Sequence, residues 1–199
     1  METKIGKNSN VGVGGVVRLQ ALFRGNKSRR VHVERARNNL PWSPFVPAKL
    51  EAVNAILRVA SLQPGETLVD IGSGDGRVVI EAAVQCPELK KALGVELDEA
   101  LVKLSRPTSL REKVEIVHAD FMEIDMRNAD VVVLFFLPHK DISRMLQLKL
   151  RPGTRVVTYV FQIAQWKPEK VVPTVPFMTA KGSSSIFLYR VPNTPDLQL

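Results

Sequence analysis

The sequence of 199 residues predicts an α/β fold in which helices cover the faces of a mainly parallel sheet. From about residue 47 onward, short apolar segments alternate with segments of helical periodicity, which is the pattern of repeated strand–helix units. Segment 130–137 (DVVVLFFL) is apolar throughout, as expected for a strand that is buried on both faces. Short turns rich in glycine and proline separate the units. We therefore expect a doubly wound domain.

The elements of the first half follow from periodicity and from the residues that end them. Leu50, Val53 and Leu57 fall on one face of a helix. Pro87 limits the helix that follows the glycine-rich segment. The expected elements are, in order, a helix over 48–61, a strand over 67–71, a helix over 76–85, a strand over 92–97, a polar helix, and a strand over 114–119.

The second half predicts four further strands and one helix. The turn at 151–153 (RPG) separates this helix from the strand that follows it. The expected elements are a strand over 130–137, a helix over 140–149, and strands over 154–161, 171–175 and 184–191. The domain thus contains seven predicted strands, and no internal repeat is visible.

The excess positive charge lies almost entirely outside this domain. The formal net charge is +8, and residues 1–40 hold nine Lys/Arg and two Glu, a net charge of +7. Residues 41–199 hold nineteen basic and eighteen acidic residues, a net charge of +1, so the body gives no support for a nucleic-acid-binding surface. We divide the chain into a basic N-terminal arm (1–40), a proline strap (41–48) and the α/β domain (49–199).

Composition also excludes several classes of protein. No segment approaches the roughly 20 consecutive apolar residues that a membrane-spanning helix needs. The single cysteine, Cys86, excludes an internal disulfide framework and a cysteine-based zinc site, and it fits a reducing compartment. Three isolated histidines give no metal-ligand spacing, so we expect no metal site.

The segment Val69–Arg77 (VDIGSGDGR) lies between the first strand and its helix, where ligands usually bind in this fold class. Gly72, Gly74 and Gly76 remove side chains where the backbone must turn sharply and touch a ligand. The spacing matches neither the dinucleotide loop GxGxxG nor a phosphate-binding P-loop. Asp70, just before the glycines, is unfavourable for a pyrophosphate but suits a ligand with an ammonium group. The methionine end of S-adenosylmethionine carries such a group and a sulfonium.

Two further acids follow the next two predicted strands. Glu96 ends the strand LGVEL, where a carboxylate can accept both hydroxyls of a ribose. Asp120 ends the strand VHAD, in position to accept a hydrogen bond from an adenine amino group. Each acid alone also fits an ordinary strand end that faces water. All three signals on consecutive strands predict a site for S-adenosylmethionine.

With these residues the chain resembles the class I, seven-stranded S-adenosylmethionine-dependent methyltransferases. It is most similar to a branch of small protein-lysine methyltransferases, which includes an archaeal enzyme of broad specificity and the mitochondrial enzymes that modify the c-subunit of ATP synthase and the adenine nucleotide translocase. The resemblance covers about residues 44–190, and the shared segments are PFVPA, DIGSGDGRVVI, GVEL, ADF, LRPGTRVVTYVF and QWKP. It implies a Rossmann-like sheet with an antiparallel C-terminal strand, S-adenosylmethionine as cofactor, and a protein substrate that bears the target lysine.

The resemblance also implies which residues form the site. The strap is expected to close over the methionine end of the cofactor. The expected cofactor-binding residues are Phe45, Val46, Pro47, Asp70, Gly72, Ser73, Gly74, Gly76, Glu96, Leu97, Asp120 and Phe121. The expected substrate-binding residues are Leu137, Pro138 and Trp166.

The fifth predicted strand departs from the pattern of this branch. Members tend to carry a histidine or an acid there, in runs like SHEF, whereas residues 158–161 read TYVF. Tyr159 is the candidate catalytic residue, with its hydroxyl as a partner for the acceptor amine, and a core or rim tyrosine is the other interpretation. After the fourth strand, residues 135–139 (FFLPH) lack the Asn/Asp-Pro-Pro-Tyr/Phe motif of enzymes that methylate base amines.

The basic arm carries a motif of its own. Leu19, Gln20, Arg24, Gly25 and Arg29 match the spacing of the IQ motif, which resembles helices that bind calmodulin and light chains. This predicts calmodulin or another EF-hand protein as a partner. A mitochondrial targeting segment and a solvated arm that contacts anionic partners remain open as interpretations. The expected compartment is intracellular, either mitochondrial or cytoplasmic.

The sequence therefore predicts an S-adenosylmethionine-dependent protein-lysine methyltransferase. The alternative is a catalytically weak or inactive scaffold with the same fold that binds calmodulin or a related EF-hand protein through the arm. A methyltransferase that acts on RNA or a small molecule is a third interpretation, which salt-sensitive RNA affinity in the body of the protein would support.

Overall fold

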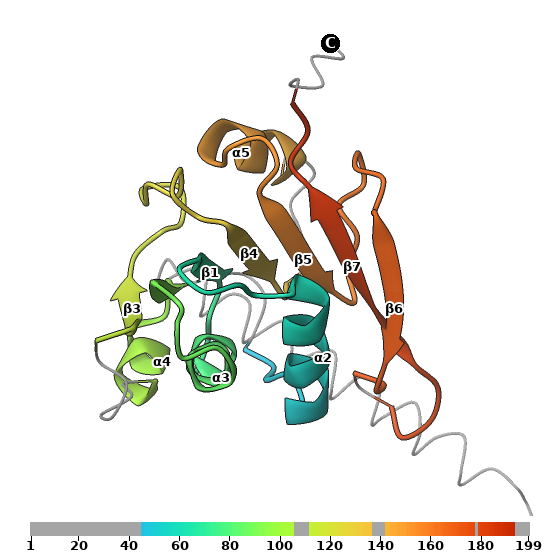
Figure 1. Cartoon of the computed structure of the whole chain (residues 1–199). Coiled ribbons are helices and arrows are strands. Elements are labelled where there is room, and N and C mark those ends of the chain that lie inside the picture. The colour runs from blue at the N-terminus through green and yellow to red at the C-terminus, as the bar shows by residue number, and fades with distance from the viewer. Residues whose placement is uncertain (1–44, 106–111, 137–141, 178, 194–199) are drawn as a thin grey trace, which may run out of the picture. The chain divides into compact units, whose positions relative to one another are not determined.

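Seven strands form one sheet in the computed structural model of the chain (Figure 1). The strands are β1 (Thr67–Ile71), β2 (Lys91–Glu96), β3 (Val114–His118), β4 (Val131–Leu134), β5 (Arg155–Tyr159), β6 (Lys170–Thr174) and β7 (Ser184–Arg190). Their order across the sheet is β3-β2-β1-β4-β5-β7-β6. After β1 the chain continues to β2 and β3 on one side of β1, and after β3 it crosses to β4 on the other side. The strand order therefore reverses between β1 and β4, and ligands bind at the carboxyl ends of the strands at such a switch point.

The structure describes residues 45–105, 112–136, 142–177 and 179–193, all of which belong to the unit Phe45–Leu199. Two groups of predicted residues lie outside the described part of the chain. They are the partner-binding residues Leu19, Gln20, Arg24, Gly25 and Arg29 of the arm, and the substrate-binding residues Leu137 and Pro138.

The direction of the strands confirms the predicted fold class. The pairs β1–β2, β1–β4, β2–β3 and β4–β5 are parallel, and β7 is antiparallel to both β5 and β6. The predicted strand over 130–137 is shorter than expected, since β4 spans only Val131–Leu134. Phe135 leaves the sheet and packs against the aromatic ring of Tyr159, with ring centroids 4.7 Å apart.

The described part of the chain contains four helices, of which α2 precedes β1 and the other three connect strands. They are α2 (Leu50–Ala60), α3 (Arg77–Gln85), α4 (Glu99–Leu104) and α5 (Ile142–Lys149). The buried face of α2 includes Val53, Ile56 and Ala60, which recur at helical spacing. The carboxylate of Asp98 caps α4 by accepting a hydrogen bond from the backbone of Ala100 (3.0 Å). Within the described ranges, no helix has the length and apolar character needed to span a bilayer.

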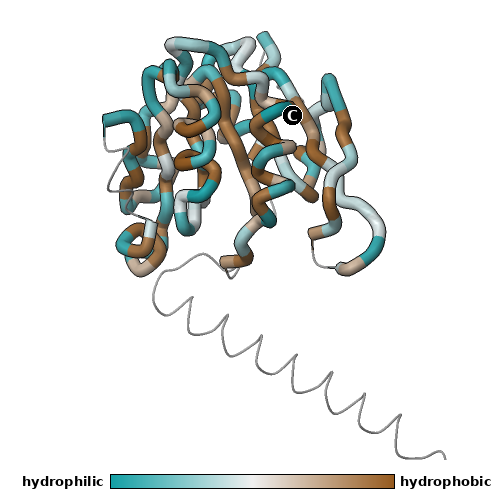
Figure 2. The backbone as a smooth tube through the Cα atoms, turned by 60° about the horizontal axis from the view of Figure 1, so that its bottom comes forward, coloured by the Kyte–Doolittle hydropathy of each residue, from teal (hydrophilic) through white to brown (hydrophobic). Residues whose placement is uncertain are grey.

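Two apolar clusters, one on each face of the sheet, form the core. The first packs α2 and α3 against the sheet and includes Ile56, Val79 and Val133. The second packs α5 against the other face and includes Leu146 and Val132. Figure 2 shows hydrophobic segments running through the centre of the molecule, with hydrophilic segments around them. Alternate residues of β4 thus belong to opposite clusters, which explains why this strand is apolar throughout.

An ion pair links the connection after α2 to the start of β5. The carboxylate of Glu66 pairs with the guanidinium of Arg155 and also accepts a hydrogen bond from the backbone of Gln63 (2.8 Å). Arg155 in turn donates to the carbonyl oxygen of Ser61 (2.9 Å). The two charged side chains are only 14% and 21% exposed, so solvent screens this pair far less than an ordinary surface pair.

We expect Arg155→Met to lower the free energy of unfolding by about 2 kcal/mol, because it leaves the Glu66 carboxylate partly buried without its cation. The measurement is urea unfolding at neutral pH. Lys103→Met is the control, since Lys103 pairs with Glu99 through side chains that are 62% and 60% exposed. This control should cost less than about 0.5 kcal/mol. Equal losses in the two variants would contradict the structural role of the Glu66–Arg155 pair.

Candidate functional site

The glycine-rich loop joins β1 to α3 in a conformation that requires its glycines. Gly72, Gly74 and Gly76 have φ angles of 73°, 57° and 79°, in the left-handed region that side chains disfavour. The N–H groups of Gly72 and Ser73 donate to the carbonyl oxygen of Val95 at 2.8 and 3.1 Å, which fastens the loop to β2. The helix α3 begins directly after Gly76, so its free N–H groups face the loop.

Two glycines also allow a close approach that any side chain would prevent. A Cβ atom on Gly74 would lie 2.2 Å from the ring of Phe45, and one on Gly94 would lie 2.7 Å from Oγ of Ser73. Gly94 lies in the interior of β2, where sequence reasoning assigned it no role. Its function is to let the loop residue Ser73 sit against the sheet.

Two carboxylates are buried at the carboxyl ends of β1 and β2. Asp70 is 3% exposed and Glu96 is 5% exposed. The two oxygens of Glu96 accept hydrogen bonds from the backbones of Gly74 and Asp98, each at 2.8 Å. Glu96 therefore fixes the loop by one oxygen and the start of α4 by the other, and each oxygen keeps a lone pair for a further donor.

The described residues provide no cation for these two acids, since neither Asp70 nor Glu96 forms an ion pair there. Burial raises the pKa of Asp70 well above its usual value, and the neighbouring charges of Glu96 and Asp75 raise it further. Oγ of Ser73 is buried and has no hydrogen-bond partner among the described residues. Buried carboxylates without a cation, beside an unused hydroxyl, form a donor and acceptor set that fits a cationic, hydroxyl-bearing ligand.

The third predicted acid lies on the same edge of the sheet. Asp120 follows β3, which pairs with β2 so that His118 lies opposite Glu96. One carboxylate oxygen of Asp120 accepts a hydrogen bond from the backbone of Met122 (2.9 Å). Asp120 is exposed, and the neighbouring predicted residues Leu97 and Phe121 are partly buried. Because β1, β2 and β3 are adjacent, the sheet brings Asp70, Glu96 and Asp120 to one edge.

The described end of the strap is tied to this edge by Arg77, the first residue of α3. Its guanidinium donates to the carbonyl oxygen of Ala48 and forms a fork with the carboxylate of Asp75, with Nε to Oδ1 at 2.8 Å. Phe45 and Val46 are 38% and 41% exposed, although the ring of Phe45 lies against Gly74. Arg77 was assigned no role from the sequence. The signal that could have identified it is the acid two residues before the arginine in GDGR, a spacing that allows an ion pair.

Tyr159, the predicted catalytic residue, is almost fully buried. It is 1% exposed, and its hydroxyl donates to the carbonyl oxygen of Val175 at 3.3 Å. Its ring packs with Phe135 and Phe177, whose centroids lie 4.7 and 6.0 Å away. The following residue, Val160, lies in a bend directly after β5 and has a φ of 70°, which is rare for a β-branched residue. These contacts give Tyr159 a packing role, and its catalytic role stays a prediction.

Trp166 lies on the other face of the sheet from Tyr159. It is 8% exposed, belongs to the core cluster that packs against α5, and contacts Tyr189 with ring centroids 6.1 Å apart. Its role in binding substrate also stays a prediction. No group of His, Cys, Asp or Glu in the described part of the chain is arranged to hold a metal ion.

Comparison with known proteins identifies the family. Residues 70–170, just over half of the chain, match the profile described as the ANTKMT methyltransferase domain. The chain belongs to this family. Its matched segment begins at Asp70 and includes the glycine-rich loop, Glu96 and Asp120.

Individual relatives extend this assignment. The chain is 34% identical over 140 residues to a protein-lysine N-methyltransferase of Saccharolobus islandicus (strain REY15A), and the match covers 67% of this chain and 86% of that protein. It is 33% identical over 154 residues to the adenine nucleotide translocase lysine N-methyltransferase of Mus musculus, covering 74% of this chain. The latter match spans only 63% of the mouse protein.

A solved structure supports the same conclusion. The chain is 31% identical to an RNA methyltransferase from Salinibacter ruber in complex with S-adenosyl-L-homocysteine, with a TM-score of 0.65 over 75% of this chain and 95% of that one. The chain therefore contains an S-adenosylmethionine-dependent methyltransferase domain. The buried carboxylates, the left-handed glycines and the unused Ser73 hydroxyl fit that cofactor.

We expect Asp70→Asn to stabilise the ligand-free protein at pH 7 by about 1 kcal/mol, or roughly 2–4 °C in Tm, while weakening binding of S-adenosylmethionine about tenfold. Since the folded-state pKa of Asp70 is raised, the folded protein binds more protons above pH 3.8, and this acid costs stability as pH rises through its folded pKa. Thermal unfolding from pH 4 to 7 and calorimetric titration are the measurements. The stability gain should shrink toward pH 4.

Asp125→Asn is the control for this prediction, because Arg127 lowers the pKa of Asp125 to about 2, and removing that charge should destabilise the protein slightly instead. A loss of stability in both variants at pH 7 would contradict the prediction that burial makes ionised Asp70 unfavourable in the folded protein.

We expect Arg77→Lys to raise the Kd for S-adenosylmethionine about five- to tenfold, because a lysine cannot hold the Ala48 carbonyl and the Asp75 carboxylate in the same fork. Arg127→Lys is a matched control. Arg127 forms the same fork with Asp125, two residues before it, with Nε to Oδ1 at 3.0 Å, and this pair is exposed away from the strap. Calorimetry that shows equal affinity for the Arg77 variant and the wild type would contradict a role of Arg77 in cofactor binding.

Proposed function

We propose that this chain transfers a methyl group from S-adenosylmethionine to the side-chain amine of a lysine in a protein. The observation that carries the proposal is the pair of buried carboxylates, Asp70 and Glu96, without a cation beside a loop of left-handed glycines, in a chain whose relatives are named lysine N-methyltransferases. The match covers 86% of the archaeal relative and 63% of the mouse relative, so the lysine acceptor is inferred from the domain that they share with this chain.

Each of the three acids binds a different part of the cofactor. Glu96, with a lone pair left on each oxygen, accepts the ribose hydroxyls, and Asp70 accepts the ammonium group. The second carboxylate oxygen of Asp120 accepts from the adenine amino group, with Leu97 and Phe121 beside it. The loop residues Gly72, Ser73, Gly74 and Gly76 supply close backbone approach.

The strap and the aromatic residues exclude water around the reacting atoms. When bound, S-adenosylmethionine supplies an electrophilic methyl group on a sulfonium centre. Phe45, Val46 and Pro47 cover the methionine end, held by Arg77. Phe135 and Phe177, both partly buried at the carboxyl ends of β4 and β6, provide apolar surroundings that lower the pKa of an acceptor amine and favour its neutral, nucleophilic form.

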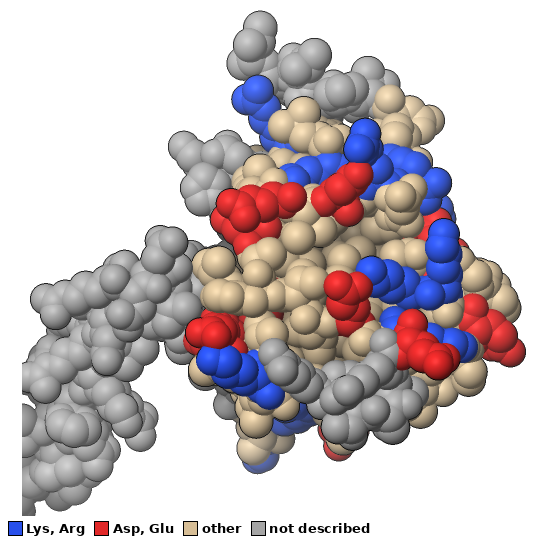
Figure 3. Space-filling view, turned by 90° about the vertical axis from the view of Figure 1, so that its left-hand side faces the viewer, with Lys and Arg blue, Asp and Glu red and all other residues tan. Residues whose placement is uncertain are grey.

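The charge balance of the domain, a net +1 over residues 41–199, favours a protein over RNA as the acceptor. On the side that carries β3, Figure 3 shows acidic and basic side chains interspersed. Several of them form pairs there, such as Lys91 with Glu115 and Lys103 with Glu99. A domain that binds the RNA backbone needs a surface dominated by one sign of charge.

For the arm, we propose binding of calmodulin or another EF-hand protein through the IQ-like residues. The support is their spacing and the net charge of +7 on residues 1–40, which complements an acidic partner. A mitochondrial or a cytoplasmic location is likewise proposed from sequence alone. Binding of calmodulin to the full chain, with and without calcium, tests the arm, and equal binding by an Arg24→Glu variant would contradict it.

We expect the full chain to transfer label from methyl-tritiated S-adenosylmethionine to lysine in proteins of a cell extract. Amino-acid analysis of the labelled protein identifies the methylated side chain. Glu96→Gln should reduce incorporation at subsaturating cofactor at least about tenfold, since it weakens the acceptor of the ribose hydroxyls. The same variant should raise the Kd for S-adenosylmethionine by a similar factor.

An extract in which all lysines were previously acetylated chemically is the control, and it should take up little label because an amide nitrogen is not nucleophilic. Label that is released by ribonuclease would show an RNA acceptor and contradict the proposal. A wild-type chain that binds the cofactor but labels neither protein nor RNA would assign it to the scaffold alternative.

A further inference from the structure

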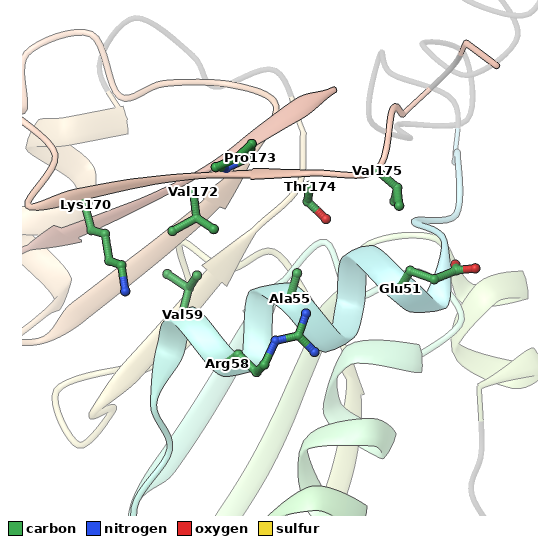
Figure 4. A pocket seen from close by; sticks show the side chains of 9 residues that line it. All are labelled: Glu51, Ala55, Arg58, Val59, Lys170, Val172, Pro173, Thr174 and Val175. Atoms are coloured by element: carbon green, nitrogen blue, oxygen red, sulfur yellow. The ribbon is translucent and has the colours of Figure 1, made fainter. Parts of the chain in front are cut away.

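A groove of about 450 Å³ lies between α2 and the edge strand β6 (Figure 4). Its floor is apolar and is formed by Ala55 and Val59 of α2, which are buried, and by Val172 and Val175 at β6, which are partly buried. The cofactor residues proposed above do not line it. This groove therefore provides a second surface, open to solvent and next to the methyltransfer site.

The groove runs lengthwise along β6, from the carboxyl ends of β5 and β6 to their amino ends. At one end, α2 begins directly after the strap, and Nζ of Lys49 donates to the carbonyl oxygen of Pro176 at 2.8 Å, which joins the two walls. At the other end, α2 stops where Arg155, the first residue of β5, donates to the carbonyl oxygen of Ser61. Because β6 runs parallel to β5, Val175 lies at the carboxyl ends of these strands, as does the strap, and Lys170 lies at their amino ends.

Charge distinguishes the two ends of the groove. Glu51 lies at the end near the strap and Lys170 at the far end, and the side chain of Arg58 extends along α2 from the far end toward Ala55 (Figure 4). Arg58 and Lys170 are exposed, and neither forms an ion pair within the described ranges. A ligand that is cationic near the strap and anionic at the far end would match this pattern.

We propose that the groove holds an extended segment of the protein substrate, with the target lysine beyond the Glu51 end and acidic residues between Arg58 and Lys170. This inference rests on the proposed lysine transfer. The charge pattern disfavours the basic arm of the chain as the occupant, because Arg58 and Lys170 repel it. Side chains hold the segment, since Pro173 has no N–H and interrupts any continuous ladder along β6.

The distance between Glu51 and Arg58 sets the expected spacing between the target lysine and the acidic residues of the substrate. Glu51 and Arg58 are seven residues apart on α2, which corresponds to about 10 Å along the helix axis. An extended chain covers that distance in about three residues. Since the lysine must reach past Glu51 to the strap, we expect the acidic residues about four or five positions from the lysine. The groove does not fix the chain direction, so acids on either side of the lysine satisfy it.

The test uses synthetic fluorescent peptides with one lysine, apolar β-branched residues, and two glutamates placed as above on the N-terminal or the C-terminal side. Otherwise identical peptides carry glutamine at both positions. The variant is Arg58→Glu with Lys170→Glu. The control is Lys90→Glu with Arg144→Glu, which makes the same change in net charge at exposed residues away from the groove. Fluorescence anisotropy measures binding, and methyl transfer is measured in parallel.

We expect one glutamate peptide to bind the full chain at least about fivefold more tightly than its glutamine counterpart. We expect this preference to disappear in the groove variant and to persist in the control variant. A preference that survives in the groove variant, or no preference in the wild type, would overturn the proposal. Sedimentation that shows a dimer lost only in the groove variant would assign the groove to a second copy of the chain and also overturn it.

Binding and transfer separate this inference from the proposed function. If the glutamine peptide is methylated and no preference for glutamate exists, lysine transfer stands and the groove proposal fails. If the glutamate peptide binds through Arg58 and Lys170 but neither a peptide lysine nor a lysine of the extract proteins is methylated, the groove binds an acidic segment and the proposed lysine transfer fails.

Discussion

The burial of two acids side by side, Asp70 and Glu96, at the carboxyl edge of a hydrophobic sheet is the constraint on which the site depends. Neither forms an ion pair in the described part of the chain, and burial raises the pKa of Asp70 well above its usual value. The loop stabilises the Glu96 carboxylate with a hydrogen bond from the backbone N–H of Gly74. In the binding mode proposed above, the ammonium group of S-adenosylmethionine contacts Asp70, which would link the cost of ionising Asp70 to the affinity for the cofactor.

The neighbouring elements act on this edge through backbone contacts more than through further charges. Gly94 leaves room for Ser73, Gly74 leaves room for Phe45, and Arg77 holds the carbonyl oxygen of Ala48. The helix α2 begins two residues after Ala48 and continues as one wall of the groove beside β6. In the proposed function, the contact between Arg77 and Ala48 therefore connects the strap that covers the cofactor with the start of the groove.

The sequence predicted much of this fold because its determinants are local. The alternation of apolar and amphipathic segments located all seven strands. Asp70 and Glu96 lie on the adjacent strands β1 and β2, and Asp120 follows the next strand, β3. The bend at Val160 could not be predicted, since a positive φ contradicts the local preference of a β-branched residue. The same is true of Arg77 and Ala48, whose contact joins residues 29 positions apart and has no periodic signal.

The position of β7 has a consequence for how the chain acquires its structure during synthesis. β7 lies between β5 and β6 in the sheet but comes after both in the chain. Until Ser184–Arg190 leaves the ribosome, β6 has no neighbour in the sheet and β5 exposes an unpaired edge. The nascent domain therefore passes through a state with an open, apolar strand edge, the kind of surface that chaperones bind. One wall of the proposed docking groove is thus the last part of the domain to form.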